Sequence, residues 1–393
     1  MANVSSSNGL EKRPNLRFPN FDEPWKVFRA EELFKNIADK NHPAETVLTI
    51  VQGKGTLPRE NAGRNIHYDN ASLSNYKKVE KGDYIIHLRS FEGGLEMANE
   101  DGIVSPAYTI LRCKKPHSSL FYEAYFHTDE FINHVLSKSV EGIRDGRQIS
   151  YDAFKWLGLP YCSLPEQEKI SNLFSALNRR IEKQQQLVDA LKKYKRGVVS
   201  AILSHRIVFS DADGKPYPEW TSCTLQDAVV FLDGQRKPLE SADRARRQGK
   251  YPYYGASGII DYIDDYIFDE PLLLLGEDGA NIINRSTPLC FIATGKYWVN
   301  NHAHVMRPQN GHNIKFLCEL LESLDYTRYN TGTAQPKLNQ EKCRGIELNL
   351  PIYEEQCRIA DFLSSLDQKA EREQANLDCL LLFKRGLMQQ LFI

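Results

Sequence analysis

Two long stretches of the chain, residues 164–204 and 353–393, repeat apolar residues at alternating spacings of three and four. Eight of ten successive positions on this spacing are apolar in each stretch. The pattern keeps one stripe of a helix against a partner and is typical of a coiled coil. We therefore predict two long helices. Their predicted seam residues are Ile170, Phe174, Leu177, Ile181, Val188 and Leu191 in the first, and Ile359, Leu363, Leu366, Leu377, Leu380 and Leu387 in the second.

The two stretches are copies of each other at a constant offset of 189 residues. Glu-Gln at 166–167 matches Glu-Gln at 355–356, and Lys-Arg-Gly at 195–197 matches the same triplet at 384–386. A fixed period of this kind marks an internal repeat. The expected layout is a domain, a helix, a second domain and a second helix.

The charges of the two helices favour pairing with each other. Residues 166–203 hold eight basic and four acidic side chains, whereas residues 354–393 hold five basic and seven acidic ones. Opposite balances disfavour pairing of either helix with its own copy. Because a domain between them returns the chain, an antiparallel pair is the simplest arrangement. The alternative is that each helix packs only onto its own domain.

The segment before the first helix and the segment between the two helices predict two mixed α/β domains. Strand-like runs occur at 46–51 and 84–88 in the first domain, residues 20–163, and at 272–275 in the second, residues 205–352. Residues 1–10 are rich in Ser and Asn, and residues 1–19 are expected to form a disordered tail. The predicted fold class is thus α+β, with two such domains in tandem, an antiparallel coiled coil and a pseudo-twofold repeat.

Composition narrows the class of protein. A net charge of −1 argues against a protein that binds a polyanion over its whole surface. Binding of a polyanion would then have to rely on local basic patches. No run approaches the roughly 18–20 apolar residues of a membrane span. The eight cysteines are scattered, which is typical of thiols in a reducing cytoplasm. We expect a cytoplasmic protein that does not associate with membranes.

The second domain contains a basic patch followed by polar loops. Residues 235–250 carry a local net charge of +4 and run into an aromatic, hydroxyl- and glycine-rich segment at 251–258. Basic side chains can neutralise phosphates, and loop-borne polar groups can reach base edges. A solvated surface loop followed by an ordinary aromatic strand is the open alternative. Further polar turns occur at 276–281, 300–302 and 332–339.

The candidate DNA-contact residues are basic, polar or aromatic and lie in predicted loops, since such side chains read phosphates and groove edges. In the first domain they are Lys54, Arg59, Arg64, Ser105, Tyr108, Arg144, Arg147 and Gln148. In the second domain they are Arg236, Lys237, Lys250, Tyr253, Tyr254, Ser257, Lys296, Asn301, His302, Thr333, Gln335 and Lys337.

Motifs for catalysis are missing from the sequence. There is no GxxxxGK[ST] phosphate loop, no GxGxxG turn and no Asn-Pro-Pro-Tyr methylation pocket. His302 and His304 have no evident third ligand, so no metal site is predicted. A set of acidic residues together with Lys296 could resemble the active site of a nuclease. The alternative functions are therefore a stand-alone nuclease or a protein-binding assembly scaffold. That acidic set is Asp264, Asp265, Asp269, Glu277 and Asp278.

These features resemble a known family. Leu-Pro-Glu-Gln-Glu-Lys-Ile at 164–170, with the Lys-Arg-Gly triplets, is similar to the conserved regions of the specificity (S) subunit of type I restriction-modification systems. Tyr353-Glu354 departs from the Leu-Pro of the first copy, and the first domain matches more loosely than the second. The similar stretches of the second domain are 253–259, 276–281, 298–304 and 332–338.

The resemblance implies a non-catalytic subunit that reads a bipartite target in double-stranded DNA. Each domain would read one half-site, and the helix pair would set the unread spacer. Two methyltransferase subunits and the restriction or motor subunits would dock on this scaffold. Those partners would use S-adenosylmethionine, ATP and magnesium, and no cofactor is expected in this chain.

Overall fold

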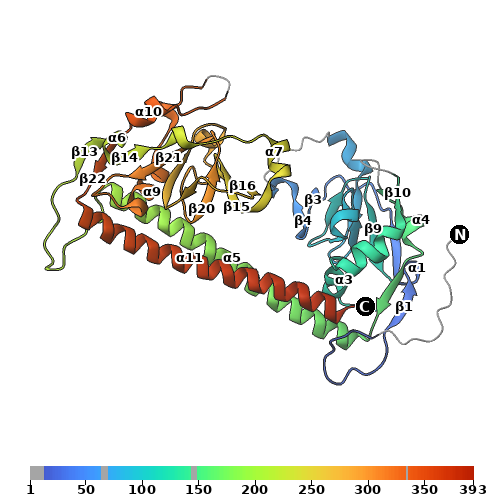
Figure 1. The fold of residues 1–393 in the computed structure, drawn as a ribbon. Coiled ribbons are helices and arrows are strands. Elements are labelled where there is room, and N and C mark those ends of the chain that lie inside the picture. The colour runs from blue at the N-terminus through green and yellow to red at the C-terminus, as the bar shows by residue number, and fades with distance from the viewer. Residues whose placement is uncertain (1–12, 63–69, 143–147, 333–334) are drawn as a thin grey trace. The chain divides into compact units, whose positions relative to one another are not determined.

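The computed structural model describes residues 13–62, 70–142, 148–332 and 335–393. The chain forms two compact units, of which the first comprises residues 1–185 and 375–393, and the second residues 186–374. Each unit therefore combines one mixed domain with part of both long helices (Figure 1).

The first unit is built on an antiparallel sheet with the strand order β2-β9-β6-β7. Phe34 and Tyr84 of this sheet pack against Phe121, Tyr122 and other aromatic residues of α3 in a core dominated by rings. The sheet consists of β2 (Phe34–Ile37), β9 (Thr109–Cys113), β6 (Tyr84–Ile86) and β7 (Glu96–Met97), and α3 spans Ser119–Phe126. Two-stranded pairs are β1 (Lys26–Arg29) with β12 (Gly158–Tyr161), β3 (Leu48–Val51) with β4 (Gly55–Pro58), β5 (Lys77–Val79) with β8 (Gly102–Val104), and β10 (Val140–Glu141) with β11 (Gln148–Ile149).

The second unit contains two four-stranded sheets. The first has the order β14-β21-β18-β19, and the second β16-β15-β20-β17 with β15 and β20 parallel. Their strands are β14 (Val229–Phe231), β21 (Ala303–Pro308), β18 (Leu272–Gly276), β19 (Cys290–Ala293), β16 (Gly258–Ile263), β15 (Gln248–Gly255), β20 (Lys296–Val299) and β17 (Phe268–Asp269). A further pair joins β13 (Thr221–Thr224) to β22 (Glu347–Leu350).

The leucine run at 272–275 is the central buried strand β18. Leu273 and Leu275 pack into the core that also contains α9 (Ile314–Ser323), whereas Leu272 and Leu274 pack into a second core. Alternate residues of a strand point to opposite faces, so a strand covered on both faces reads as a continuous apolar run.

The internal repeat extends to the topology of both units. Strands β12 and β22 lie 189 residues apart, and so do the first residues of α4 (Tyr151–Phe154) and α10 (Gln340–Arg344). In each unit the outer pair, β1 with β12 and β13 with β22, begins directly after a tryptophan, Trp25 or Trp220. The predicted internal repeat is thereby confirmed at the level of topology.

The long helices are α5 (Leu164–Leu203) and α11 (Tyr353–Leu391), and they pair antiparallel (Figure 1). In the first unit the Phe174 ring, near the start of α5, stacks on the ring of Phe392, 5.9 Å away, just beyond the end of α11. In the second unit Lys192 Nζ, from the other half of α5, lies 3.2 Å from Gln374 Oε1 of α11. The predicted antiparallel coiled coil is therefore confirmed.

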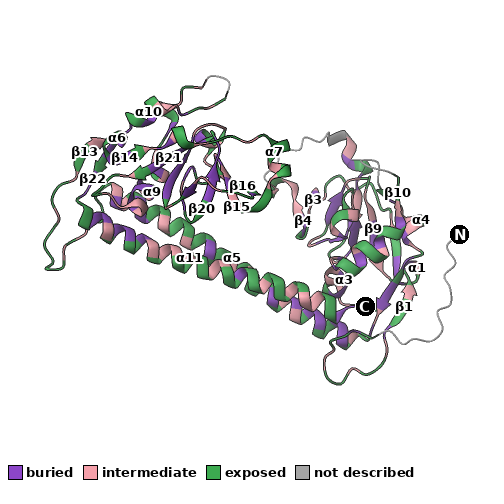
Figure 2. Ribbon diagram, in the orientation of Figure 1, coloured by how far each residue is buried: buried purple, intermediate pink, exposed green. Residues whose placement is uncertain are grey.

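Every predicted seam position is buried or half-buried. Buried, intermediate and exposed residues are interspersed along both helices (Figure 2). Each long helix also packs onto the domain that precedes it, as the alternative interpretation expected. Ile170 packs into the first-unit core and Ile359 into the second, next to the domain that precedes each helix. The C-terminal end of each helix packs into the other core: Ile202 of α5 into the second-unit core and Leu391 of α11 into the first-unit core.

The polar seam position Lys195 belongs to a four-membered ion-pair network in the second unit. Its Nζ lies 2.6 Å from Glu319 and 2.7 Å from Asp367, and Lys315 bridges the same two carboxylates. Burial acts to raise the pKa of Asp367, but the bonds from both lysines hold it below its ordinary value. The equivalent Lys384 has a pKa lowered by burial, which the nearby Glu123 carboxylate opposes.

The tail prediction is wrong for residues 13–19, while residues 1–12 lie outside the described residues. The Leu16 N–H donates to the Gln390 carbonyl, 2.9 Å away. The Arg17 guanidinium forms two hydrogen bonds, of 2.7 and 2.8 Å, with the buried Glu166 carboxylate. A buried carboxylate needs a cationic partner, and Glu166 takes it from this segment.

Candidate nucleic-acid interface

Four turns and one loop of the second unit meet in what we call the loop platform. It comprises residues 233–237, 255–258, 277–281, 300–302, 330–332 and 335–338. Backbone hydrogen bonds join these segments: Asn300 N–H donates to Tyr254 O, Glu277 to His302 O, Gly279 to Pro336 O and Leu338 to Glu277 O, over 2.7 to 3.1 Å. A Cβ at Gly276, at the end of β18, would lie 2.6 Å from the Ala256 carbonyl oxygen, so this close approach requires glycine.

The platform presents polar side chains to solvent. Ser257 lies at the tip of the β15–β16 hairpin, and Asn301 and His302 occupy the turn between β20 and β21. These residues and those of the 330–338 loop offer both hydrogen-bond donors and acceptors, as readout of base edges requires. The predicted contact residues exposed on the platform are Lys237, Ser257, Asn301, His302, Gln335 and Lys337.

Arg236 belongs to the platform, but its side chain bonds to other platform residues instead of facing solvent. Its Nη1 donates to Glu277 Oε2 over 2.7 Å and to the Ala303 carbonyl over 2.8 Å. The side chain is 14% exposed. Its prediction as a phosphate contact is therefore corrected, because the guanidinium is satisfied by the protein and braces the turns.

The two predicted tyrosines are core residues. Tyr253 is 1% exposed, and its hydroxyl accepts a hydrogen bond from the Leu239 N–H. Tyr254 is half-buried against the Phe291 and Tyr297 rings. The prediction of a DNA contact is wrong for Tyr253, because the alternation of the β15 strand turns this ring inward.

Lys250 and Lys296 lie away from the platform. The parallel register of Tyr253 with Trp298 brings together the early residues of β15 and β20, at the opposite ends of these strands from the platform turns. Lys250 Nζ lies 5.2 Å from the Tyr251 ring centroid, and Lys296 Nζ lies 4.6 Å from that of Tyr266. The structure therefore divides the predicted residues of this domain into two groups.

In the first unit, Lys54 is exposed on the turn between β3 and β4. The buried Glu96 carboxylate fixes this turn by accepting the N–H groups of Gly53 and Gly55, 2.7 and 2.9 Å away. Its Oε1 also lies 3.2 Å from His127 Nε2. Sequence reasoning missed Glu96, because its partners are distant in the chain.

The remaining predictions for the first domain are scattered. Arg59 lies 5.9 Å from the Tyr76 ring centroid. Ser105 Oγ accepts the Ala107 N–H within a turn that leads to the half-buried Tyr108. Gln148 is exposed on β11. Arg64, Arg144, Arg147 and, in the second domain, Thr333 lie outside the described residues.

The acidic turns do not assemble into a nuclease-like cluster. Within the described ranges no group of three or more His, Cys, Asp and Glu residues could hold a metal ion. Each acidic residue has a basic neighbour instead. The pairs are Asp264 and Asp265 with Arg247, Asp269 with Lys296, Glu277 with Arg236, and Asp278 with His302.

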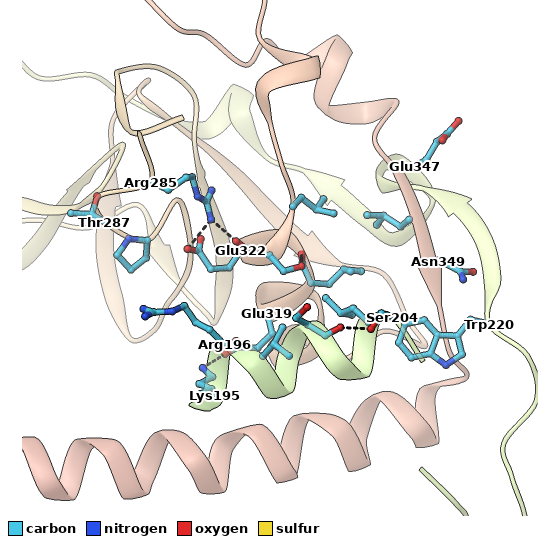
Figure 3. A pocket seen from close by; sticks show the side chains of 18 of the residues that line it. Lys195, Arg196, Ser204, Trp220, Arg285, Thr287, Glu319, Glu322, Glu347 and Asn349 are labelled. Carbon is cyan, nitrogen blue, oxygen red and sulfur yellow. Dashed lines mark hydrogen bonds and ion pairs between the residues drawn. The ribbon is translucent and has the colours of Figure 1, made fainter. Parts of the chain in front are cut away.

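A cavity of about 850 Å³ lies elsewhere in the second unit, between α5, the 285–288 turn and α9 (Figure 3). Trp220, Arg196 and Glu319 are among the residues that line it. At one wall Arg285 pairs with Glu322, 2.8 Å away. No predicted DNA-contact residue lines this cavity, which is therefore distinct from the loop platform.

Residues 217–379 match the family described as type I restriction modification DNA specificity domain. Residues 217–379 of the chain are thus similar to this family. The match covers the loop platform and all of the second domain's strands. In the part of the chain that the structure describes, no helix is both long and apolar enough to cross a membrane.

Curated specificity subunits align with part of the chain. The Haemophilus influenzae type I restriction enzyme specificity subunit S.HindORF215P is 32% identical over 149 residues, which are 38% of this chain and 37% of that protein. The Escherichia coli EcoprrI specificity subunit is 30% identical over 145 residues, 37% of this chain and 35% of that protein. The chain thus spans little more than a third of these relatives in the alignments.

Solved structures resemble the whole chain in fold. The type I restriction-modification S subunit from M. genitalium superposes with a TM-score of 0.58 at 16% identity, covering 97% of this chain and 99% of its own. A chain from a study of complex assembly and conformational transition of the type I R-M system gives 0.56 at 15% identity, covering 96% and 99%. At these identities the likeness shows the fold alone.

Proposed function

We propose that this chain selects the DNA sequence on which a type I restriction-modification complex acts, and that it performs no catalysis itself. Each domain reads one half of a bipartite target in double-stranded DNA. Two methyltransferase subunits and the restriction or motor subunits assemble on the chain. They supply the chemistry of S-adenosylmethionine, ATP and magnesium.

The observation that carries the proposal is the loop platform within the matched specificity domain. Its exposed side chains include an amide pair, Asn301 and Gln335, and the cation Lys337. Amides pair with adenine edges, and lysine pairs with guanine edges or phosphates. The buried ion pairs beneath them hold the turns in place, and preformed donors and acceptors lose little conformational entropy on binding.

Exchange of the second domain tests separate reading. When residues 220–340 are replaced by the corresponding segment of a relative with a different target, one half of the methylated site is expected to change. The other half is expected to stay as it was, because the first domain is intact. Methylation mapping by long-read sequencing of cells that express the complex measures both halves.

A change in both halves, or in neither, would contradict reading by separate domains. Incubation of the purified chain alone with DNA and magnesium is the control for the nuclease alternative, and intact DNA is expected. Footprinting of the assembled complex is the control for the scaffold alternative. Protection that does not depend on this chain's sequence would favour a scaffold.

The helix pair is proposed to set the unread spacer between the half-sites. Insertion of one heptad at the same level of α5 and α11 preserves the seam and adds about 10 Å of helix. The spacer in the methylated target is then expected to lengthen by about three base pairs, at about 3.4 Å each. The half-sites should be retained, and an unchanged spacer would remove this role from the helices.

A further inference from the structure

His304 lies beneath the loop platform and is satisfied at both ring nitrogens. Its side chain is 1% exposed on β21. Nδ1 lies 2.7 Å from Asp233 Oδ2, and Nε2 lies 2.9 Å from the carbonyl oxygen of Leu338. A neutral imidazole has one N–H group and one acceptor nitrogen, so it can donate to only one of these oxygens. Both bonds form together only when the ring is doubly protonated.

The surroundings of Asp233 require that this carboxylate be ionised. Oδ1 accepts the Val305 N–H over 2.8 Å, and Oδ2 also accepts Gln340 Nε2–H over 2.7 Å. The Arg236 guanidinium adds a cation 3.5 Å away. All of these partners are donors, so a proton on the carboxyl group would displace one of them.

The charged and titratable groups that face His304 come from several elements. Burial acts to lower its pKa, but the hydrogen bond to Asp233, followed by an interaction with the Cys343 thiol, raises the pKa to about 10. The same pairing keeps the pKa of Asp233 below its ordinary value despite burial. The facing groups are Asp233 and Arg236 of the 233–236 turn, Glu277 at 3.8 Å after β18, and Cys343 of α10.

Leu338 directly follows the loop that exposes Gln335 and Lys337. Its carbonyl accepts from His304, and its N–H donates to the Glu277 carbonyl over 2.7 Å. The side chain is fully buried. One imidazolium therefore links β21, the 233–236 turn and the base of the 330–338 loop.

We infer that His304 is a positioning residue, whose imidazolium clamps residues 335–338 in the orientation that reads DNA. The inference rests on the proposed function. It predicts that loss of the Leu338 bond frees Gln335 and Lys337, so that discrimination between target and other DNA falls while contact with phosphates persists. The bond to Asp233 alone is not sufficient, because it leaves the Leu338 carbonyl unpaired.

Two substitutions separate the two bonds. His304→Asn places an amide near Nδ1, keeping the Asp233 bond and losing the Leu338 bond, whereas His304→Gln places an amide near Nε2 and does the reverse. In the complex assembled with methyltransferase subunits, His304→Asn is expected to lower affinity for target DNA roughly tenfold or more, because a charge-assisted bond is lost. His304→Gln is expected to lose less, and affinity for scrambled DNA should change little in both.

His134→Asn is the matched control, since this histidine is 62% exposed in the first unit and is outside the predicted contacts. Equal losses for His304→Asn and His304→Gln, or wild-type binding by both, would overturn the inference. A wild-type complex that does not distinguish target from scrambled DNA would instead overturn the proposed function. These two failures are therefore distinguishable.

A measurement on the unaltered chain covers the case in which a variant does not fold. In ¹⁵N-histidine spectra of the full chain at pH 8, both nitrogens of His304 are expected to be protonated, and a neutral ring would contradict the clamp. The folded pKa lies above the unfolded value of about 6.5. The stabilisation is therefore complete below about pH 6.5 and is lost as the pH rises through about 10. Amide exchange at Leu338 should quicken over that range.

Discussion

Replacement of Phe392 by alanine is expected to lower the free energy of unfolding of the first unit by roughly 3–5 kcal/mol, the cost of truncating a buried phenylalanine. Phe392 is 6% exposed and lies among four aromatic rings. Its ring centroid is 5.4 to 6.3 Å from those of Trp25, Phe121, Tyr125 and Phe174. No neighbouring element can fill the space that the ring vacates without leaving its own contacts.

Phe383→Ala is the matched control, since Phe383 lies nine residues earlier on α11 and is 57% exposed. Its effect on the purified chain is expected to be within about 0.5 kcal/mol. Urea unfolding followed by amide hydrogen exchange assigns the loss to each unit separately. Equal effects of the two substitutions would contradict the role of Phe392 as an anchor of the first-unit core.

Replacement of Gln356 by alanine is expected to destabilise the second unit by roughly 2–4 kcal/mol. Its Oε1 accepts the Asn313 N–H over 2.9 Å, and its Nε2 donates to the Pro351 carbonyl over 2.8 Å. The residue is 1% exposed, and its truncation would leave the buried Pro351 carbonyl and the part-buried Asn313 N–H without this partner. Each such group costs about 1–3 kcal/mol.

The repeat supplies a second test of the same bond pattern. Gln167 accepts the Ser118 N–H over 3.0 Å and donates to the Cys162 carbonyl over 2.9 Å. Gln167→Ala is expected to destabilise the first unit by a similar amount. Gln368→Ala, at an exposed position of α11, is the control and should have little effect. Chemical denaturation of the three variants measures this, and a large loss in the control would refute the argument.

These two glutamines explain why the repeated Glu-Gln motif occurs where each long helix begins. Asn313 precedes α9 and Ser118 precedes α3, so each glutamine ties the start of a domain helix to the start of a coiled-coil helix. The motif therefore has a structural function within each unit. The sequence revealed the repetition, but the N–H groups that each glutamine accepts lie more than 40 residues away in the chain.

The polar turns of the second domain could be found from the sequence, but not which of their side chains are exposed. Residues 276–281, 300–302 and 335–338, which the sequence marks as polar turns, lie together in the structure. The burial of Arg236 and Tyr253 could not be foreseen, because composition does not distinguish a buried from an exposed basic or aromatic side chain. The role of His304 could not be foreseen either, because its partners Asp233 and Leu338 lie 71 and 34 residues away in the chain.

The sequence by itself determined the two seams, the offset of 189 residues, the antiparallel sense of the helix pair and the buried leucine strand. Each of these follows from a local period or from a comparison of one segment with another. Only the tertiary structure decided that the last turns of α5 pack into the second-unit core and those of α11 into the first-unit core, that residues 13–19 supply Arg17 to Glu166, and that His304 holds Leu338. Such contacts depend on which distant groups meet when water is excluded, and no spacing along the chain encodes that meeting.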